Sequence, residues 1–167
     1  MKSIVIKNIS RNPVHNIQVN PVRNWQINPV RNWQINPARN WQINPVRNWQ
    51  INPVRNWQIN PTRNMQIDPH RNIILNPIYS QDIPGYYVWS VADSKCLYFT
   101  VKALTQNVFL FFDADQTFCF FAVGALDCYA VYTAADMKYV GSLCPNGAGR
   151  FNWFSQDGKW QFFLTRF

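Results

Sequence analysis

The polar and apolar positions of residues 12–75 follow one eight-residue pattern, Asn-Pro-x-Arg-Asn-Trp-Gln-Ile. Within it, Asn-Trp-Gln-Ile-Asn alternates polar and apolar residues, which is the period of a β-strand because successive side chains point to opposite faces. Asn-Pro-x-Arg is typical of a turn, since proline presets the first turn angle and the preceding asparagine accepts a backbone hydrogen bond. Each unit therefore predicts one corner and one short strand, with tryptophan and isoleucine on the same face.

A fixed short period predicts a small unit stacked on copies of itself. Helix is not expected, because a proline every eight residues would interrupt every second turn and asparagine favours caps over helix interiors. We expect residues 1–80 to form a short-repeat β-solenoid or stacked β array with rows of like side chains. The alternatives are a meander and a chain that is disordered in isolation. The outer copies carry another residue in place of tryptophan, as is typical of the capping units of an array. These residues are Ile17, Met65 and Ile73.

From Tyr86 the pattern changes to aromatic and β-branched segments separated by turn residues. Short strands at close, regular spacing predict an all-β domain over residues 81–167, an antiparallel β-sandwich or a jelly-roll-like double sheet. The last segment alternates and ends on Phe167, like the final strand of an outer-membrane barrel. The first residues do not have the pattern of a signal peptide, so we expect an edge or closing strand of the sandwich instead. The predicted strands are Tyr86–Val91, Cys96–Ala103, Val108–Phe112, Phe118–Val123, Cys128–Tyr132, Tyr139–Cys144, Arg150–Phe154 and Trp160–Thr165.

Three of these segments, Leu97–Ala103, Val108–Leu110 and Phe151–Lys159, together resemble the farnesoic acid O-methyltransferase-like domain. The resemblance covers roughly residues 86–167. The middle segment departs from the family pattern, because only Phe120 to Gly124 occupies the position of that segment. It implies a β-sandwich binding module. The chain has no glycine-rich turn after a parallel strand that would hold S-adenosylmethionine, so methyl transfer is not expected.

Charge divides the chain at the same place as the pattern. Residues 1–80 carry a net charge of +9, and residues 81–167 carry −1. This asymmetry indicates nucleic acid, an anionic polysaccharide or an acidic surface as a partner of the repeats. The alternative is that the arginines only keep the repeats in solution.

The candidate binding residues are the arginine and tryptophan rows of the repeats. Facing solvent, the tryptophans would form a platform for sugar rings or bases while the arginines pair with anions. Facing inward, they would be core. We favour burial, either between two sheets or at a self-association surface, because an exposed row of five tryptophans is an aggregation hazard. The two rows comprise Arg23, Arg31, Arg39, Arg47, Arg55, Arg63 and Arg71, and Trp25, Trp33, Trp41, Trp49 and Trp57.

Residues that would support catalysis or metal binding are sparse. Residues 81–167 contain no histidine and no glutamate, which removes the commonest general acids and bases from that part. Asp113 and Asp115 are expected to be a solvated turn. The chain has four cysteines, and their spacing forms no CxxC pair, so a zinc site is not expected. Because no leader sequence is recognised, we expect reduced thiols in the cytoplasm. The four residues are Cys96, Cys119, Cys128 and Cys144. No enzyme activity, cofactor, metal or membrane span is therefore expected.

These observations together predict a non-enzymatic structural or recognition protein. Its repeat array would self-associate or make multivalent contacts, with a carbohydrate or an anionic polymer as a candidate partner, and the sandwich would bind a ligand. The alternative is a nucleic-acid-associated protein that binds through the arginine and tryptophan rows.

Overall fold

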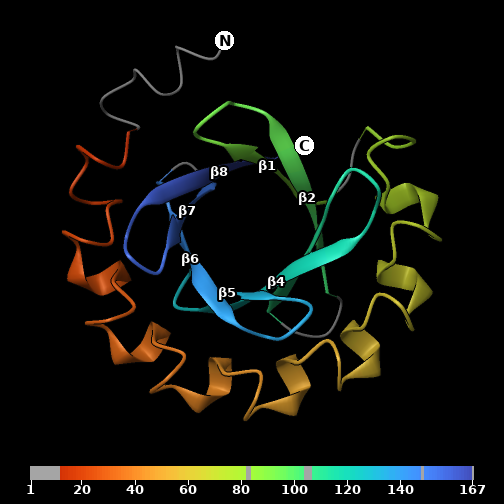
Figure 1. Cartoon of the computed structure of the whole chain (residues 1–167), viewed down its shortest axis with the longest axis horizontal. Helices are drawn as coiled ribbons and strands as arrows, with labels where there is room; N and C mark the ends of the chain where they lie inside the picture. The colour runs from red at the N-terminus through yellow and green to blue at the C-terminus, as the bar shows by residue number, and fades with distance from the viewer. Residues whose placement is uncertain (1–11, 82–83, 104–106, 148, 167) are drawn as a thin grey trace.

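The C-terminal part of the computed structural model is a closed barrel of antiparallel strands (Figure 1). The structure describes residues 12–81, 84–103, 107–147 and 149–166. Each strand pairs with its neighbours in chain order, and the last pairs back with the first. The strands are β1 (Tyr86–Ser90), β2 (Cys96–Lys102), β3 (Val108–Phe112), β4 (Phe118–Ala125), β5 (Cys128–Thr133), β6 (Tyr139–Pro145), β7 (Phe151–Ser155) and β8 (Trp160–Arg166).

The all-β prediction for this part and the positions of its eight strands are confirmed to within two residues, but the predicted sandwich is wrong. β8 pairs with β7 and also with β1, where Val88 lies opposite Leu164, so the sheet has no edge. Irregularities interrupt the register within β1, β3, β5 and β7, at every second strand. Such bulges bend strands and increase their twist, which helps a sheet to close on itself.

The barrel interior is filled with side chains. Phe111, Trp153 and Leu164 are buried within it, as part of a cluster to which seven of the eight strands contribute buried residues. Trp153 lies with its ring centroid 5.6 Å from that of Phe111 and 4.8 Å from that of Phe162. The interior is thus a packed core, and a ligand of the barrel would have to bind outside it.

The repeats form helical turns, which corrects the predicted β-solenoid or stacked β array. Each Trp-Gln-Ile segment is a three-residue 3₁₀ helix, as are the equivalent residues 65–67 and 73–75, whereas residues 17–19 form a turn. The preceding asparagine caps it, as where the Asn24 side chain accepts a hydrogen bond from the Gln26 amide. The seven helices are η1 (Trp25–Ile27), η2 (Trp33–Ile35), η3 (Trp41–Ile43), η4 (Trp49–Ile51), η5 (Trp57–Ile59), η6 (Met65–Ile67) and η7 (Ile73–Leu75).

The proline is compatible with these turns because each of them is so short. Asn28 caps the Asn-Pro-Val-Arg segment as Asn24 caps the 3₁₀ helix before it. The Asn28 side chain accepts a hydrogen bond from the Val30 amide, and its carbonyl accepts from the amides of Arg31 and Asn32. Pro29 therefore occupies the first position of a turn, where the missing N–H has no intrahelical partner to lose. Each unit is two asparagine-capped turns, and no turn extends far enough for a proline to interrupt it.

Side-chain amides join one unit to the next, in place of a strand ladder. The capping asparagine before each 3₁₀ helix from η1 to η7 donates to the carbonyl of the residue six positions earlier, over 2.6–3.3 Å. The asparagine before proline donates in the same way to the preceding unit's proline carbonyl at Asn44, Asn52 and Asn76. Both asparagines thus satisfy backbone groups in two units at once.

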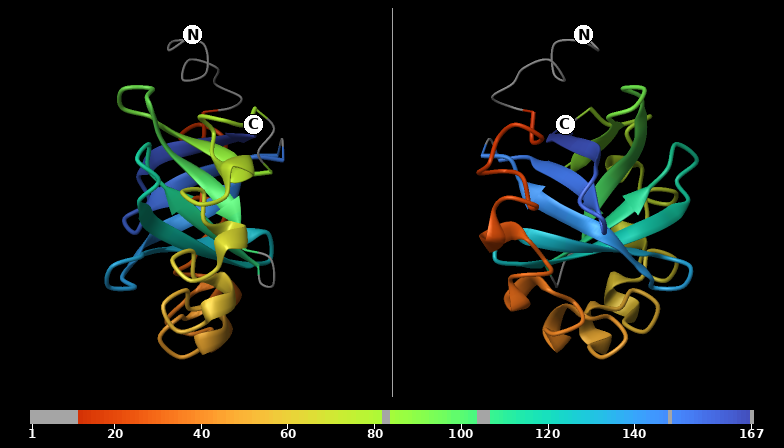
Figure 2. Two further views of the ribbon diagram at one scale, coloured as in Figure 1. Left: turned by 90° about the vertical axis from the view of Figure 1, so that its right-hand side faces the viewer. Right: turned by 60° about the vertical axis from the view of Figure 1, so that its left-hand side comes forward.

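The repeats wrap around the outside of the barrel, and we call residues 12–80 the belt (Figures 1 and 2). Ile43, Ile51, Ile59 and Ile67 belong to one buried cluster with the outward side chains of β2 to β5. The Tyr132 hydroxyl also donates to the Ile43 carbonyl, and burial raises the pKa of Tyr132 well above its ordinary value, so the donor stays protonated. Whether residues 1–80 and 81–167 are separate domains stays a prediction, and in the structure they share this core.

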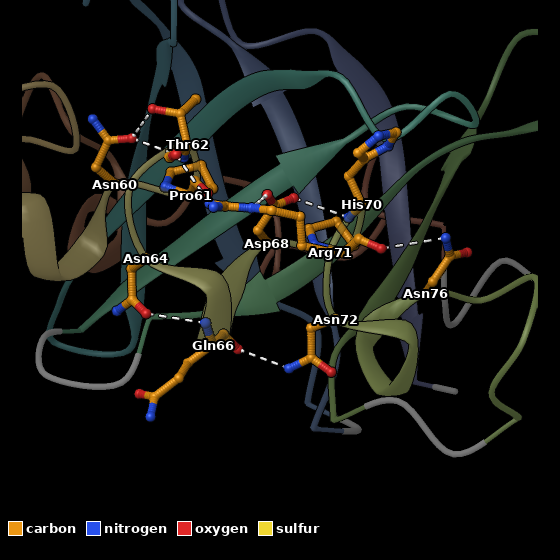
Figure 3. Close-up of polar contacts among 11 residues, drawn as sticks. Asn60, Pro61, Thr62, Asn64, Gln66, Asp68, His70, Arg71, Asn72 and Asn76 are labelled. Carbon is orange, nitrogen blue, oxygen red and sulfur yellow. Dashed lines mark hydrogen bonds and ion pairs between the residues drawn. The ribbon is translucent and has the colours of Figure 1, made fainter.

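One unit replaces its asparagine by Asp68, which has no amide to donate (Figure 3). Its carboxylate accepts from the His70 amide and pairs with Nε of Arg71 at 2.6 Å. Nη2 of Arg71 in turn donates to the carbonyls of Pro61, at 3.1 Å, and Thr62, at 2.9 Å. The Pro61 carbonyl is the acceptor that an asparagine at position 68 would use, so the guanidinium of Arg71 takes over the missing bond.

Arg71→Ala is expected to lower the free energy of unfolding by about 1 kcal/mol, because the buried Pro61 loses its donor. The same substitution made together with Asp68→Asn is expected to cost less, since the new amide can donate to Pro61. Urea denaturation of the two single variants and the double variant measures this coupling. Arg63→Ala, at the same position of the preceding unit, is the control, and additive effects of the two changes would contradict the exchange of donors.

Candidate functional site

The five tryptophans of the belt face solvent, so the expected burial between two sheets is wrong, and burial at a self-association surface stays a prediction. Each exposes 56–61% of its surface, whereas the isoleucine two residues later is buried in four of the five units. A 3₁₀ helix has about three residues per turn and therefore directs these two side chains to different sides, unlike a strand. The exposed row continues at both ends with Ile17, Met65 and Ile73.

The belt arginines are exposed as well, and most of them are unpaired. Seven arginines and one aspartate give residues 12–81 a net charge of +6. Arg71 is held by Asp68, but the other six form no ion pair with any residue in the described part of the chain. The predicted binding residues are thus all at the surface, and Arg71 differs from the rest because it also supports the belt backbone.

Two exposed pairs of side chains alternate along the belt. In the units that carry tryptophan, the residue after proline and the arginine that follows it form one pair, and the tryptophan and the glutamine form the other. The capping asparagine lies between the pairs, while the isoleucine and the proline face the barrel in most units. The surface therefore offers a repeated set of one indole, one amide and one guanidinium, which we call a rung. Glutamine was not among the predicted site residues, although its recurrence in each unit was a visible signal.

A hollow of about 350 Å³ lies between the rungs of Trp33 and Trp41. Indole and amide groups from both rungs line it together with the side chain of Arg39. Ala125 and Leu126, at the turn between β4 and β5, contribute to its lining. Its volume is at the lower end of the range of about 300–1,000 Å³ that is usual for small-molecule sites. Aromatic faces, hydrogen-bonding amides and one cation therefore converge on a space large enough for a ring-sized ligand.

Leu126 has a backbone conformation that is unfavourable for its side chain. It and Asp127 are the two central residues of a hairpin in which Ala125 pairs with Cys128, and their φ angles are +52° and +64°. Hairpins of this kind favour asparagine and glycine, and a left-handed conformation costs other residues about 1–2 kcal/mol. Leu126 nevertheless leaves 59% of its surface exposed, so little burial offsets the strain. Sequence reasoning missed this residue because it has no motif.

A second, smaller hollow of about 170 Å³ lies between the first belt units and the turn from β7 to β8. Its belt side is formed by Val22, Val30 and their neighbouring prolines and by Asn28, without any tryptophan or arginine. It therefore lacks the combination of aromatic and cationic groups found at Trp33 and Trp41.

The residues considered for other chemistry lie apart. Within the described ranges, no group of three or more His, Cys, Asp or Glu residues is placed to hold a metal ion. Asp113 accepts hydrogen bonds from the amides of Asp115 and Thr117 and so closes its own turn. All four cysteines are free thiols, and Cys144 contacts the Ile27 carbonyl beneath the belt. The absence of enzyme activity stays a prediction.

In the part of the chain that the structure describes, no helix has the length and apolarity that a bilayer crossing requires. The resemblance of residues 86–167 to the farnesoic acid O-methyltransferase-like domain stays a prediction, and the sandwich that it implied is replaced by the closed barrel. Comparison with protein-family models, with curated proteins and with solved structures gave no match, so the function is inferred from the geometry of the belt.

Proposed function

We propose that this chain is a non-enzymatic recognition protein whose belt binds a linear acidic polysaccharide through its repeated rungs. The observation that carries the proposal is the exposure of all five belt tryptophans beside unpaired arginines. An exposed apolar row needs a function, because contiguous apolar surface of this kind otherwise promotes aggregation. An indole face can stack on a sugar ring while the guanidinium binds a carboxylate in two-point geometry.

The barrel is the scaffold in this proposal. Buried isoleucines fix the belt to the outer faces of the strands, so the rungs are held in place before a ligand arrives. Rigid presentation reduces the entropy lost on binding. Once one rung is occupied, contacts at the next are effectively intramolecular, and weak individual contacts add up to high affinity.

Self-association through the same surface is disfavoured by charge. Two belts placed face to face would bring together two surfaces that each carry +6, and like charges in an interface are repulsive. An anionic polymer has the complementary charge.

Nucleic acid is the second candidate, and the six unpaired arginines favour it, because such cations contact phosphates and release counterions. The polysaccharide is preferred for two reasons. Each rung places a glutamine amide, which can bond to hydroxyl groups, beside its indole. Among the described residues that line the hollow, Arg39 is the one cation, which suits a single carboxylate better than a densely charged phosphate backbone.

The proposal is tested by titrating the intact protein with polygalacturonate, neutral dextran and single-stranded poly(dT), following tryptophan fluorescence at about 200 mM salt, where phosphate-driven binding is already weakened. We expect polygalacturonate to bind most tightly and to change the indole emission. Tighter binding of poly(dT), with a steep loss of affinity as salt rises, would establish the nucleic acid alternative instead. If no polymer binds and the protein oligomerises as salt screens its charge, the belt is a self-association surface.

A further inference from the structure

The hollow at Trp33 and Trp41 differs in construction from a simple pair of rungs. Its lining comes from both parts of the chain, since the belt supplies the indoles, amides and guanidinium and the turn between β4 and β5 supplies Ala125 and Leu126. A flexible polymer lying along the belt would meet a side wall here. The other face of a sugar ring stacked on an indole would then also be in contact with protein.

Leu126 gives independent support for a ligand at this position. The residue combines a left-handed φ with a mostly exposed aliphatic side chain, which is unfavourable for both the backbone and solvation. Ser94, Gln116 and Met137 have a similar φ in the turns of other hairpins, so the feature specific to Leu126 is its exposed aliphatic side chain beside the hollow. A leucine beside two indoles at the rim of a hollow can supply the apolar contact that a sugar C–H face requires.

The charges around the hollow limit the class of ligand. Arg39 is the cation that lines it, and it forms no ion pair with any residue in the described ranges. One guanidinium can hold one carboxylate through two parallel hydrogen bonds, while the amides of Gln34 and Gln42 remain available for hydroxyl groups.

We propose that Trp33, Arg39, Trp41 and Leu126 form an anchoring subsite for one uronic acid residue, which fixes the position of an acidic polysaccharide along the belt. This inference rests on the proposed function and adds to it a point of specificity. The other rungs then contribute avidity, and the subsite also binds short oligosaccharides that span too few rungs to gain from repetition.

The test uses trigalacturonate as the probe and isothermal titration calorimetry of the full chain. Arg39→Gln is expected to weaken trimer binding by about tenfold or more, as for the loss of a charge-assisted pair. The matched substitution Arg55→Gln, two units further along the belt, is expected to cause a smaller loss. For polygalacturonate both variants should show reduced affinity, because each removes one rung.

Leu126→Asn gives a second and opposite signature. Asparagine is preferred at this position of the hairpin, so the melting temperature should stay the same or rise by about 2–4 °C. Trimer affinity should nevertheless fall severalfold, because the apolar wall is lost. A purely structural role for Leu126 would instead lower the melting temperature and leave the affinity unchanged.

Each result supports or overturns the subsite. Equal losses of trimer affinity for Arg39→Gln and Arg55→Gln would overturn it while leaving the multivalent belt intact. So would a wild-type protein that binds polygalacturonate but not the trimer. If wild-type protein binds neither, the proposed function itself fails. Preferential binding of a dT trinucleotide, lost in Arg39→Gln, would show that the subsite takes a nucleotide.

Discussion

Ile59→Asp is expected to prevent the chain from folding at room temperature. Ile59 is fully buried, in the cluster that joins the belt to the outward side chains of β2 to β5. An aspartate there would bury a charge with no partner nearby, and such changes cost more than about 4 kcal/mol out of a total stability of about 5–15 kcal/mol. Circular dichroism and urea denaturation measure the loss.

Val54→Asp is the matched control within the same unit. Val54 is 52% exposed, so the same change of chemistry should alter the free energy of unfolding by no more than about 0.5 kcal/mol. A folded Ile59→Asp variant, with an intact barrel and a detached belt, would show that the shared core is not required for folding. It would also favour two separate domains.

Replacing all five belt tryptophans by alanine is expected to abolish polygalacturonate binding without unfolding the protein. The loss should be about 10²–10⁴-fold, because linked weak contacts multiply their effect on affinity. Stability should hardly change, since each indole is more than half exposed and the isoleucines that form the core remain. The three tryptophans that remain, Trp89, Trp153 and Trp160, lie in the barrel and not in the belt, so calorimetry or co-sedimentation with the polymer is the appropriate measurement.

The buried isoleucines are unchanged in this variant, so its melting temperature provides the control. A large fall in melting temperature would mean that the indoles support the fold, contrary to their exposure. Unchanged polymer affinity in a stable variant would mean that the arginine row binds alone.

The strands of the barrel could be predicted from sequence because the information for them is local. Alternation of aromatic and β-branched residues between turns located all eight strands. Closure depends instead on pairing between β1 and β8, whose Val88 and Leu164 are far apart in the chain. Sandwiches and barrels use the same alternation, so the pattern did not distinguish them.

The repeats were predicted wrongly because one pattern fits two conformations. Alternation of Trp and Ile with amides indicated a strand, but the asparagine side chains bond to the amide two residues ahead and stabilise a turn instead. The proline argument excluded long helices and did not exclude single turns. Asparagine at every fourth position of the units was the signal for this geometry, since each one caps a turn.

For the candidate site, the residue types could be predicted and their orientation could not. The tryptophan and arginine rows follow directly from the repeat, whereas the outward direction of Trp33 and Trp41 depends on the 3₁₀ geometry. Leu126 could not be found from sequence at all, because it is far from the belt in the chain and its importance comes from its φ angle and its neighbours.

Identical units also make the alignment of belt and barrel ambiguous. The units 20–27, 28–35, 44–51 and 52–59 have the same sequence, so moving the belt by one unit would return most isoleucines to equivalent pockets. Contacts made by belt residues that are not repeated distinguish the observed alignment, such as the packing of Leu75 against the shared core, and only residues 81–85 separate the belt from β1. During folding, conformations in which the belt is shifted by one unit along the barrel would be close in free energy to the native state. The irregular units near the ends of the belt favour the native alignment over these alternatives.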